Sequence, residues 1–286
     1  MLFATWLVSA RHLAPSSVSV YLAAVRSLTQ QFDRGFPDPM VSTSRLHRLI
    51  RGIKRSAAPS RLSRLPITAP LLSVIHRSLA LDLFDHRMFW AACCLAFFGF
   101  LRVAEFTCPT TFDPSTHLTP ADVSLADAGT IHLWLKTSKT DPFRQGVMLH
   151  IGSSGNPICP VVAMRSYLAI RGLTPGPLFI TSAGVPLSPP IVNHWLRSIF
   201  TAAGYGSAFS SHSFRIGAAT SAAAAGIPDH LIKTLCRWSS NAYQRYIRTS
   251  PDVLTAVARG SSVKLGLVAP FWRRVRGPRN PRSSKL

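Results

Sequence analysis

Apolar positions recur at helical spacing through most of the chain and alternate as in strands only over a short central part. Spacing of three to four residues places apolar side chains on one face of a helix. In the first 65 residues it predicts one helix that opens at Pro15 and a second at about 43–54. Beyond them it predicts helices at about 69–80, 86–106, 159–171, 189–203, 212–225 and 228–236.

Two extended segments, Ile131–Leu135 and Gly146–His150, flank a polar turn that starts at Lys136, so together they predict a β-hairpin. The most apolar run, Met88–Leu101, predicts a buried helix, because it is shorter than the roughly 20 residues that cross a bilayer. The expected fold class is therefore mainly α with a small β-sheet (α+β). No membrane partner is expected.

The segment Ala57–Pro66 contains two prolines, two serines and two arginines, which is typical of a linker. It separates a helical, basic domain at 1–65 from a larger domain at 66–258. The remaining residues, 259–286, are basic and contain prolines, so they predict a disordered tail.

The charge is one-sided, with 32 Lys and Arg against 11 Asp and Glu and a net charge of +21. Such an excess favours a polyanionic partner, because each neutralised phosphate releases a counterion. The alternatives are a ribosomal-type protein and a membrane-surface binder, and we favour nucleic acid. Basic residues at helical spacing usually form a solvated face. Their number in the second helix favours contacts with DNA phosphates, from Arg45, Arg48, Arg51, Lys54 and Arg55.

The five cysteines are an odd number and contain no Cys-x-x-Cys pair. They predict neither a disulfide framework nor a zinc site, and they favour a reducing, intracellular compartment. The first residues lack the basic region and cleavage site of a signal peptide. They begin as if already within a helix, which suggests a fragment of a longer product.

Two charged pairs stand three residues apart, Arg102 with Glu105 and His212 with Arg215. Each alone is more often a surface or ion pair at a helix end. Together, two arginines can hold a phosphodiester by bidentate hydrogen bonds, a tyrosine such as Tyr246 can attack its phosphorus, and a histidine can manage the proton. The set suits phosphoryl transfer on DNA without a metal or nucleotide cofactor.

With Lys139, Trp238 and Tyr246, these residues resemble the tyrosine recombinase (phage-integrase-like) family. The order of the residues matches the family order R, K, H-x-x-R, H or W, Y over roughly residues 1–255. The matching segments are Gly99-Phe-Leu-Arg-Val-Ala-Glu105, Ser138-Lys-Thr140, His212-Ser-Phe-Arg215 and Tyr246-Ile-Arg248, and Leu65-Pro-Ile-Thr68 resembles the start of the catalytic domain. The wording Arg237-Trp-Ser-Ser240 is most similar to integrases of eukaryotic mobile elements, such as DIRS-like retrotransposons and cryptons.

The resemblance implies a role for each of these residues. Arg102 and Arg215 would bind the non-bridging oxygens of the scissile phosphate, and Tyr246 would form a 3′-phosphotyrosyl bond. His212 would act as the base and Lys139 would protonate the departing 5′-oxygen. Trp238 would donate its indole N–H to the phosphate or pack the site, and Glu105 would orient the network without touching DNA.

Three positions leave alternatives open. Tyr243 also follows Trp238, and Lys136 competes with Lys139; the local wording favours Tyr246 and Lys139. Cys236 stands where the family usually has glycine, so it could strain a turn that needs positive φ, unless the backbone there is helical.

The resemblance also implies a core-binding-type N-terminal domain, here short for the family, and a C-shaped clamp on double-stranded DNA. It implies a homodimer on each site, a homotetramer in the synapse, and a nuclear location. The alternatives are a catalytically inactive or domesticated DNA-binding relic of a mobile element and a type IB topoisomerase-like enzyme. No cofactor and no metal are expected.

Overall fold

The computed structural model describes residues 2–31, 45–56, 64–109, 111–126 and 129–238. The chain divides into two compact units, Met1–Ser63 and Arg64–Leu286, and each is described by itself. The expected tail at 259–286 and both candidate nucleophiles, Tyr243 and Tyr246, lie outside the described residues. Within the described ranges, no helix is long and apolar enough to cross a membrane.

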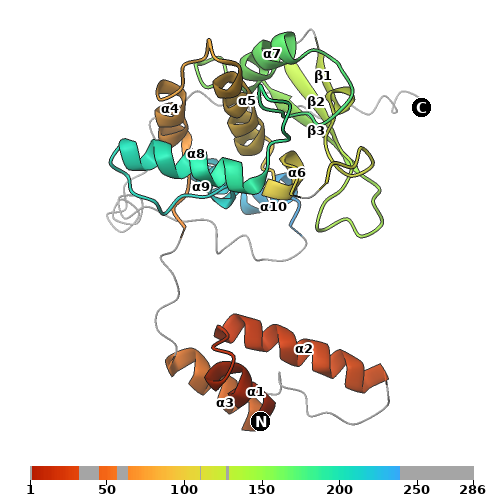
Figure 1. Ribbon diagram of the computed structural model, residues 1–286, viewed down its shortest axis with the longest axis vertical. Helices are drawn as coiled ribbons and strands as arrows, with labels where there is room; N and C mark the ends of the chain where they lie inside the picture. Colours follow the sequence, from red (N-terminus) through yellow and green to blue (C-terminus); the bar gives the residue numbers. More distant parts are fainter. Residues whose placement is uncertain (1, 32–44, 57–63, 110, 127–128, 239–286) are drawn as a thin grey trace, which may run out of the picture. The chain divides into compact units, whose positions relative to one another are not determined.

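The described residues of the N-terminal unit form the helices α1 (Leu2–Ser9), α2 (Pro15–Gln31) and α3 (Arg45–Ser56) (Figure 1). Proline suits the first turn of α2, because its missing N–H would have no helical partner there. The helices pack through a small apolar core, to which α3 contributes one buried side chain. That core consists of Ala4, Leu7, Val18, Leu22 and Leu46.

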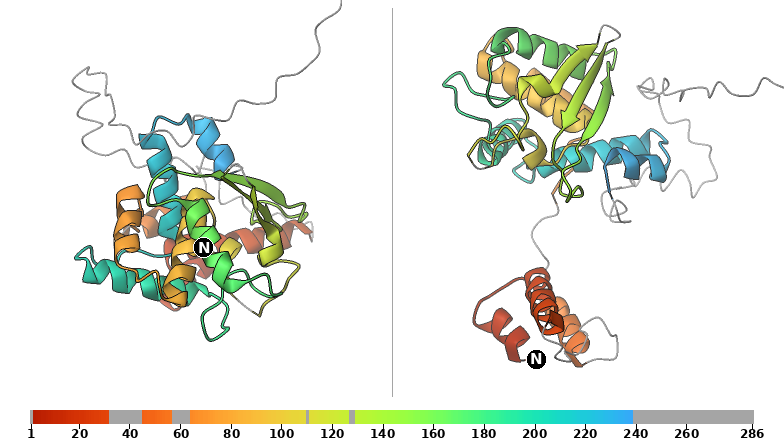
Figure 2. Two further views of the ribbon diagram at one scale, coloured as in Figure 1. Left: turned by 90° about the horizontal axis from the view of Figure 1, so that it is seen from above. Right: turned by 90° about the vertical axis from the view of Figure 1, so that its right-hand side faces the viewer.

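The larger unit is mostly helical, and α5 is its central element (Figures 1 and 2). Every residue from Met88 to Phe97 is buried, so the apolar run predicted to be a buried helix is confirmed as far as Phe98, where the helix ends. This helix packs against α7 and α9. The helices are α4 (Ala69–Arg77), α5 (Phe84–Phe98), α6 (Val103–Phe106), α7 (Pro160–Arg171), α8 (Pro189–Ala202), α9 (His212–Ala224) and α10 (Asp229–Leu235).

A three-stranded antiparallel sheet with the order β1-β2-β3 completes this unit. Its strands are β1 (Val123–Ala126), β2 (Thr130–Leu135) and β3 (Val147–Gly152). Buried side chains alternate along β2, as expected for a strand with one face on the core. The predicted hairpin corresponds to β2 and β3, whereas β1 was not predicted. The expected fold class, mainly α with a small β-sheet, is confirmed.

The helix predicted at 86–106 is wrong over its last part, because the structure breaks it at Gly99–Arg102. Phe100 adopts φ +51, and the Leu101 N–H returns to the Ala96 carbonyl at 2.9 Å. A new helical turn, α6, then begins at Val103. The break matters for the site, because it turns the Gly99 and Phe100 carbonyls towards arginines from distant parts of the chain.

The segment that enters the larger unit is fixed against the start of α9. The Leu65 N–H donates to the Ala208 carbonyl at 3.2 Å, and the Ile67 N–H donates to the Ser213 carbonyl at 3.0 Å. A Cβ atom added at Gly217 would lie 1.8 Å from the Ile67 carbonyl oxygen. Only glycine lets the backbone of this segment approach α9 so closely.

Candidate active site

Arg102 caps the start of α6 and is held to Glu105 by backbone and side-chain hydrogen bonds. The Arg102 backbone N–H donates to Glu105 Oε2 at 2.8 Å, and Arg102 Nη1 donates to Oε1 at 2.8 Å. The Glu105 side chain is 4% exposed and that of Arg102 is 18% exposed. The carboxylate thus fixes one edge of a guanidinium whose other edge can still meet a ligand.

Arg237, which directly follows α10, binds the same carboxylate. Its Nη2 lies 2.8 Å from Glu105 Oε2 and also donates to the Phe100 carbonyl at 3.2 Å, while Nη1 donates to the Gly99 carbonyl at 3.2 Å. Sequence reasoning quoted this residue within a motif but missed it as a site residue. The signal that could have found it is a second basic side chain immediately before Trp238.

Burial raises the pKa of the Glu105 carboxyl, but two opposing influences outweigh it. The charge of Arg237 and the hydrogen bonds from Arg102 hold the pKa below its ordinary value. Glu105 is therefore ionised at neutral pH and serves as the shared counterion of two guanidinium groups.

Of the two alternatives for Cys236, the helical one holds, and the positive φ lies one residue further along the chain. Cys236 has φ −78 and ψ −6, an ordinary helical conformation that any residue adopts. Arg237 takes the left-handed conformation, with φ +52. That conformation is unusual for a residue with a side chain, and the ion pair of Arg237 with Glu105 lies at this same position.

Arg215 lies on the floor of the site and is 2% exposed. Its Nη1 donates to the Phe100 carbonyl at 2.6 Å, and its Nη2 donates to the Cys236 carbonyl. The Trp238 ring covers the guanidinium, with 5.1 Å between Cζ and the ring centroid. Burial first, and then the charge of Arg102, lower the pKa of Arg215 to about 10, so it remains a cation at neutral pH.

His212 is the first residue of α9, and the three-residue spacing puts it on the same face as Arg215. Its side chain is half-buried. Burial lowers the pKa of the imidazole, and the charges of Arg64, Arg215 and Arg102 lower it further. At neutral pH the imidazole is therefore neutral and able to accept a proton.

The two candidate lysines of the β2–β3 hairpin lie in different environments. Lys136 Nζ is 2.6 Å from Asp122 Oδ2 and donates to the Pro114 carbonyl at 2.8 Å, so it holds the hairpin onto the preceding loop. Lys139 lies exposed in the loop between the strands. Both of its neighbours, Ser138 and Thr140, bond to the arginine cluster.

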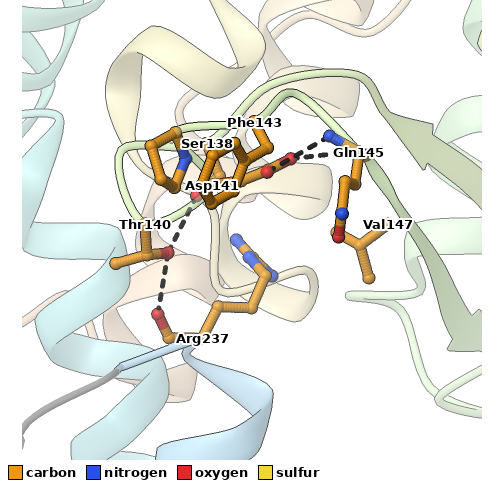
Figure 3. A pocket seen from close by; sticks show the side chains of 9 residues that line it. Ser138, Thr140, Asp141, Phe143, Gln145, Val147 and Arg237 are labelled. Carbon is orange, nitrogen blue, oxygen red and sulfur yellow. Dashed lines mark hydrogen bonds between the residues drawn. The ribbon is translucent and has the colours of Figure 1, made fainter.

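A pocket of about 430 Å³ opens between this loop and the end of α10 (Figure 3). Ser138, Thr140 and Phe143 line it from the loop side, and Arg237 lines it from the other. Arg102, Arg215 and Arg237 supply three cations, against the Glu105 carboxylate that they surround and the Asp141 carboxylate that lines the pocket, so the site carries excess positive charge. Preorganised cations around a partly buried site are suited to an anion such as a phosphodiester. Among the described residues, no group of three or more His, Cys, Asp or Glu side chains could hold a metal.

The predicted DNA-contacting residues of the N-terminal unit all lie on α3 and are exposed. Leu46, on the opposite side of the helix, is buried in the core of that unit. The exposed residues are Arg45, Arg48, Arg51, Lys54 and Arg55.

No protein-family model and no curated protein matches the sequence. Solved structures do match the fold. A crystal structure of XerA recombinase is 17% identical, with 90% of this chain and 80% of that chain covered and a TM-score of 0.52. The Tn1549 transposon integrase in complex with transposon right end DNA is 14% identical, with 90% and 83% covered and a TM-score of 0.60.

A third structure, XerH site-specific recombinase bound to difH substrate in a pre-cleavage complex, is 14% identical and has a TM-score of 0.56. The match covers 90% of this chain and 68% of the XerH chain. The fold of this chain is therefore that of the tyrosine recombinases and integrases.

Proposed function

We propose that this chain is a DNA strand transferase that cleaves and rejoins DNA through Tyr246. The observation that carries the proposal is the convergence of Arg102, Arg215 and Arg237 on one turn and one carboxylate, beside a neutral His212. This arrangement offers fixed positive charge and a proton acceptor within one site. The match of the fold to DNA-bound recombinases supports the same activity.

In the proposed reaction, Tyr246 Oη bonds to phosphorus as the bond between phosphorus and the 5′-oxygen breaks. The phenol proton passes to His212, because a phenol with a pKa near 10 needs a base at neutral pH. Arg102 and Arg215 stabilise the charge that develops on the non-bridging oxygens. Lys139 gives its proton to the leaving 5′-oxygen. The phosphotyrosyl bond conserves the energy of the phosphodiester, so rejoining needs no cofactor.

Arg215 can reach a phosphate only if the Trp238 ring yields part of its present position, because the guanidinium is 2% exposed beneath it. The contact of the Trp238 ring with the buried Arg215 cation fits the packing role that the resemblance implies.

We further propose site-specific recombination or DNA integration as the biological activity, in a nuclear integrase of a eukaryotic mobile element. The N-terminal unit would hold double-stranded DNA as a core-binding domain, through the exposed basic residues of α3. By the resemblance, a dimer would occupy each site and a tetramer would form the synapse.

Covalent trapping tests the proposal. The protein is mixed with a pool of nicked duplexes, whose short leaving fragments diffuse away after cleavage, and a denaturing gel is run beside a binding assay. We expect a DNA-linked band that Tyr246→Phe abolishes, because no other group then attacks phosphorus. Tyr243→Phe is the matched control and should keep the band.

Three other results would contradict the proposal in different ways. A band that survives Tyr246→Phe and is lost in Tyr243→Phe would move the nucleophile. Salt-sensitive binding without any band would favour the DNA-binding relic. Relaxation of a supercoiled plasmid by single protomers would favour the type IB topoisomerase-like activity.

A further inference from the structure

Lys139 lies between two hydroxyl side chains that attach its loop to opposite parts of the arginine cluster. Ser138 Oγ accepts a hydrogen bond from Arg102 Nη1 at 2.7 Å and donates to Glu105 Oε1 at 3.0 Å. Thr140 Oγ1 donates to the Arg237 carbonyl at 3.2 Å (Figure 3). The two hydroxyls lie 3.3 Å apart. We call Ser138 and Thr140 together the hydroxyl clasp.

Each hydroxyl carries one hydrogen and can donate one hydrogen bond. Ser138 donates to the Glu105 carboxylate and Thr140 donates to the Arg237 carbonyl, so both donate to groups outside the loop. A bond to a charged partner is stronger than one between neutral groups, and Ser138 makes two such bonds. The larger share of the attachment therefore belongs to Ser138.

The loop beyond the clasp is braced by Asp141. Its carboxylate accepts the Gln145 N–H at 3.2 Å and the Gly146 N–H at 2.8 Å, and its own N–H donates to the Ser138 carbonyl at 2.9 Å. Because the loop has this internal support, fixing it at the clasp also fixes the backbone of Lys139. Only the lysine side chain, which is exposed, is left to adjust.

Arg237 joins the two halves of the arrangement. Its guanidinium binds Glu105, which in turn accepts Ser138, and its carbonyl accepts Thr140. The left-handed backbone at Arg237 sets the direction of that carbonyl. Such a conformation persists only where surrounding contacts determine it.

We propose that Ser138 and Thr140 are positioning residues, which hold Lys139 where it can protonate the leaving 5′-oxygen before DNA arrives. The inference rests on the proposed strand transfer. In that step the Lys139 ammonium loses a proton to the 5′-oxygen as the phosphorus–oxygen bond breaks and the bond to Tyr246 forms. Neither hydroxyl needs to touch the DNA, so the clasp acts on this proton transfer through the placement of Lys139. Ser138 also bonds Arg102 and Glu105, and a loss transmitted through those groups would appear with any leaving group.

The test compares two leaving groups on the duplex that gives the covalent band with the unaltered protein. One duplex has the normal 5′-oxygen at the scissile bond and the other has a 5′-bridging sulfur. A thiol ionises near pH 8.5, roughly, so a sulfur leaving group needs no acid. The variants are Ser138→Ala with Thr140→Val and, as the matched control, Ser138→Thr with Thr140→Ser, which keeps both hydroxyls.

With the oxygen duplex, we expect Ser138→Ala with Thr140→Val to slow single-turnover cleavage about tenfold to hundredfold. A well-placed general acid contributes roughly 10²–10⁴-fold, and misplacing it forfeits part of that factor. With the sulfur duplex, the loss in the same variant should be much smaller, and Lys139→Ala should cleave this duplex far faster than it cleaves the oxygen duplex. The hydroxyl-preserving control should be near normal on both duplexes.

Each other result has a distinct meaning. An equal loss on both duplexes would show a general structural defect and overturn the inference, as would normal cleavage of the oxygen duplex. A missing band from the unaltered protein on both duplexes would overturn the proposed function itself. Amide hydrogen exchange without DNA gives a second measurement: exchange at 137–146 should quicken in the alanine–valine variant, and unchanged exchange there would also overturn the inference.

Discussion

On α3, Arg45, Arg48 and Arg51 are exposed, whereas in the larger unit Arg215 is 2% exposed and Arg102 and Arg237 share a buried carboxylate. The same residue type thus occurs in two electrostatic settings. Exposed charges act through water and are screened by salt beyond about 10 Å at 0.1 M. Buried ones are held in a fixed geometry. The first set suits sequence-independent attraction to DNA, and the second suits recognition of one phosphate.

The largest difference between the two regions should appear in Glu105→Gln. It keeps the shape of the side chain but leaves Arg102 and Arg237 without their shared counterion. Removing one partner of a buried pair costs about 3–5 kcal/mol, and urea unfolding of the purified protein measures this loss. On the exposed side, Arg51→Gln should change the free energy of unfolding by no more than about 0.5 kcal/mol. A loss below about 1 kcal/mol in Glu105→Gln would contradict the structural importance of the cluster.

The pH dependence of unfolding sharpens the same prediction. The pKa of Glu105 is lower in the folded state than its ordinary value of 4.5. Its contribution to stability is therefore present above pH 4.5 and is lost as the pH falls through the lower, folded value. The unaltered protein should lose this contribution in that window, and Glu105→Gln should not.

An intermediate effect is expected from Arg45→Gln, Arg48→Gln and Arg51→Gln combined. If these arginines contact phosphates, the plot of log affinity against log salt becomes less steep by about one unit for each. Binding weakens, but single-turnover cleavage at saturating DNA stays unchanged, because the catalytic cluster is intact. Fluorescence anisotropy at several salt concentrations measures the slope. An unchanged slope would show that the basic residues of α3 form a solvated face and do not contact phosphates.

The smallest effect should come from Arg64→Gln. Burial and then the charge of Arg64 lower the pKa of His212, so removing this charge lets the pKa rise. A base works only when unprotonated, so the acidic limb of the cleavage rate should move to higher pH, with a few-fold loss near pH 6 and little change at pH 8. Arg77→Gln, whose charge does not act on His212, is the control. A limb that moves to lower pH would exclude His212 as the base.

The sequence predicted elements better than it predicted where they break. The buried helix before Arg102 and the hairpin around Lys139 follow from local apolar patterns. The break at Gly99–Arg102 does not, because its carbonyls serve Arg215 and Arg237, more than 100 positions away in the chain. Strand β1 is only four residues long, so its alternating pattern was too short to recognise.

In the candidate site, too, features set by local sequence were predicted and features set by distant contacts were not. Arg102, Glu105, His212 and Arg215 were found from their combination along the chain and from the family resemblance, because neither pair was convincing alone, and the structure brings them together. The contribution of Arg237 depends on a left-handed backbone at that residue, whereas the sequence raised this conformation only as one alternative at the neighbouring Cys236. The hydroxyl clasp depends on contacts of Ser138 and Thr140 with residues 33 to 97 positions distant, which no local pattern records.

The close approach of Ile67 to Gly217 couples the segment that enters the larger unit mechanically to α9. A force along the chain from the N-terminal side reaches Leu65 and Ile67 first. The Ile67 N–H is bonded to Ser213 in the first turn of α9, and the Leu65 N–H is bonded to Ala208 in the segment before that helix. His212 and Arg215 occupy the first turn of that helix. Tension on the connection therefore acts first on the turn of α9 that carries the proposed base His212 and the buried cation Arg215.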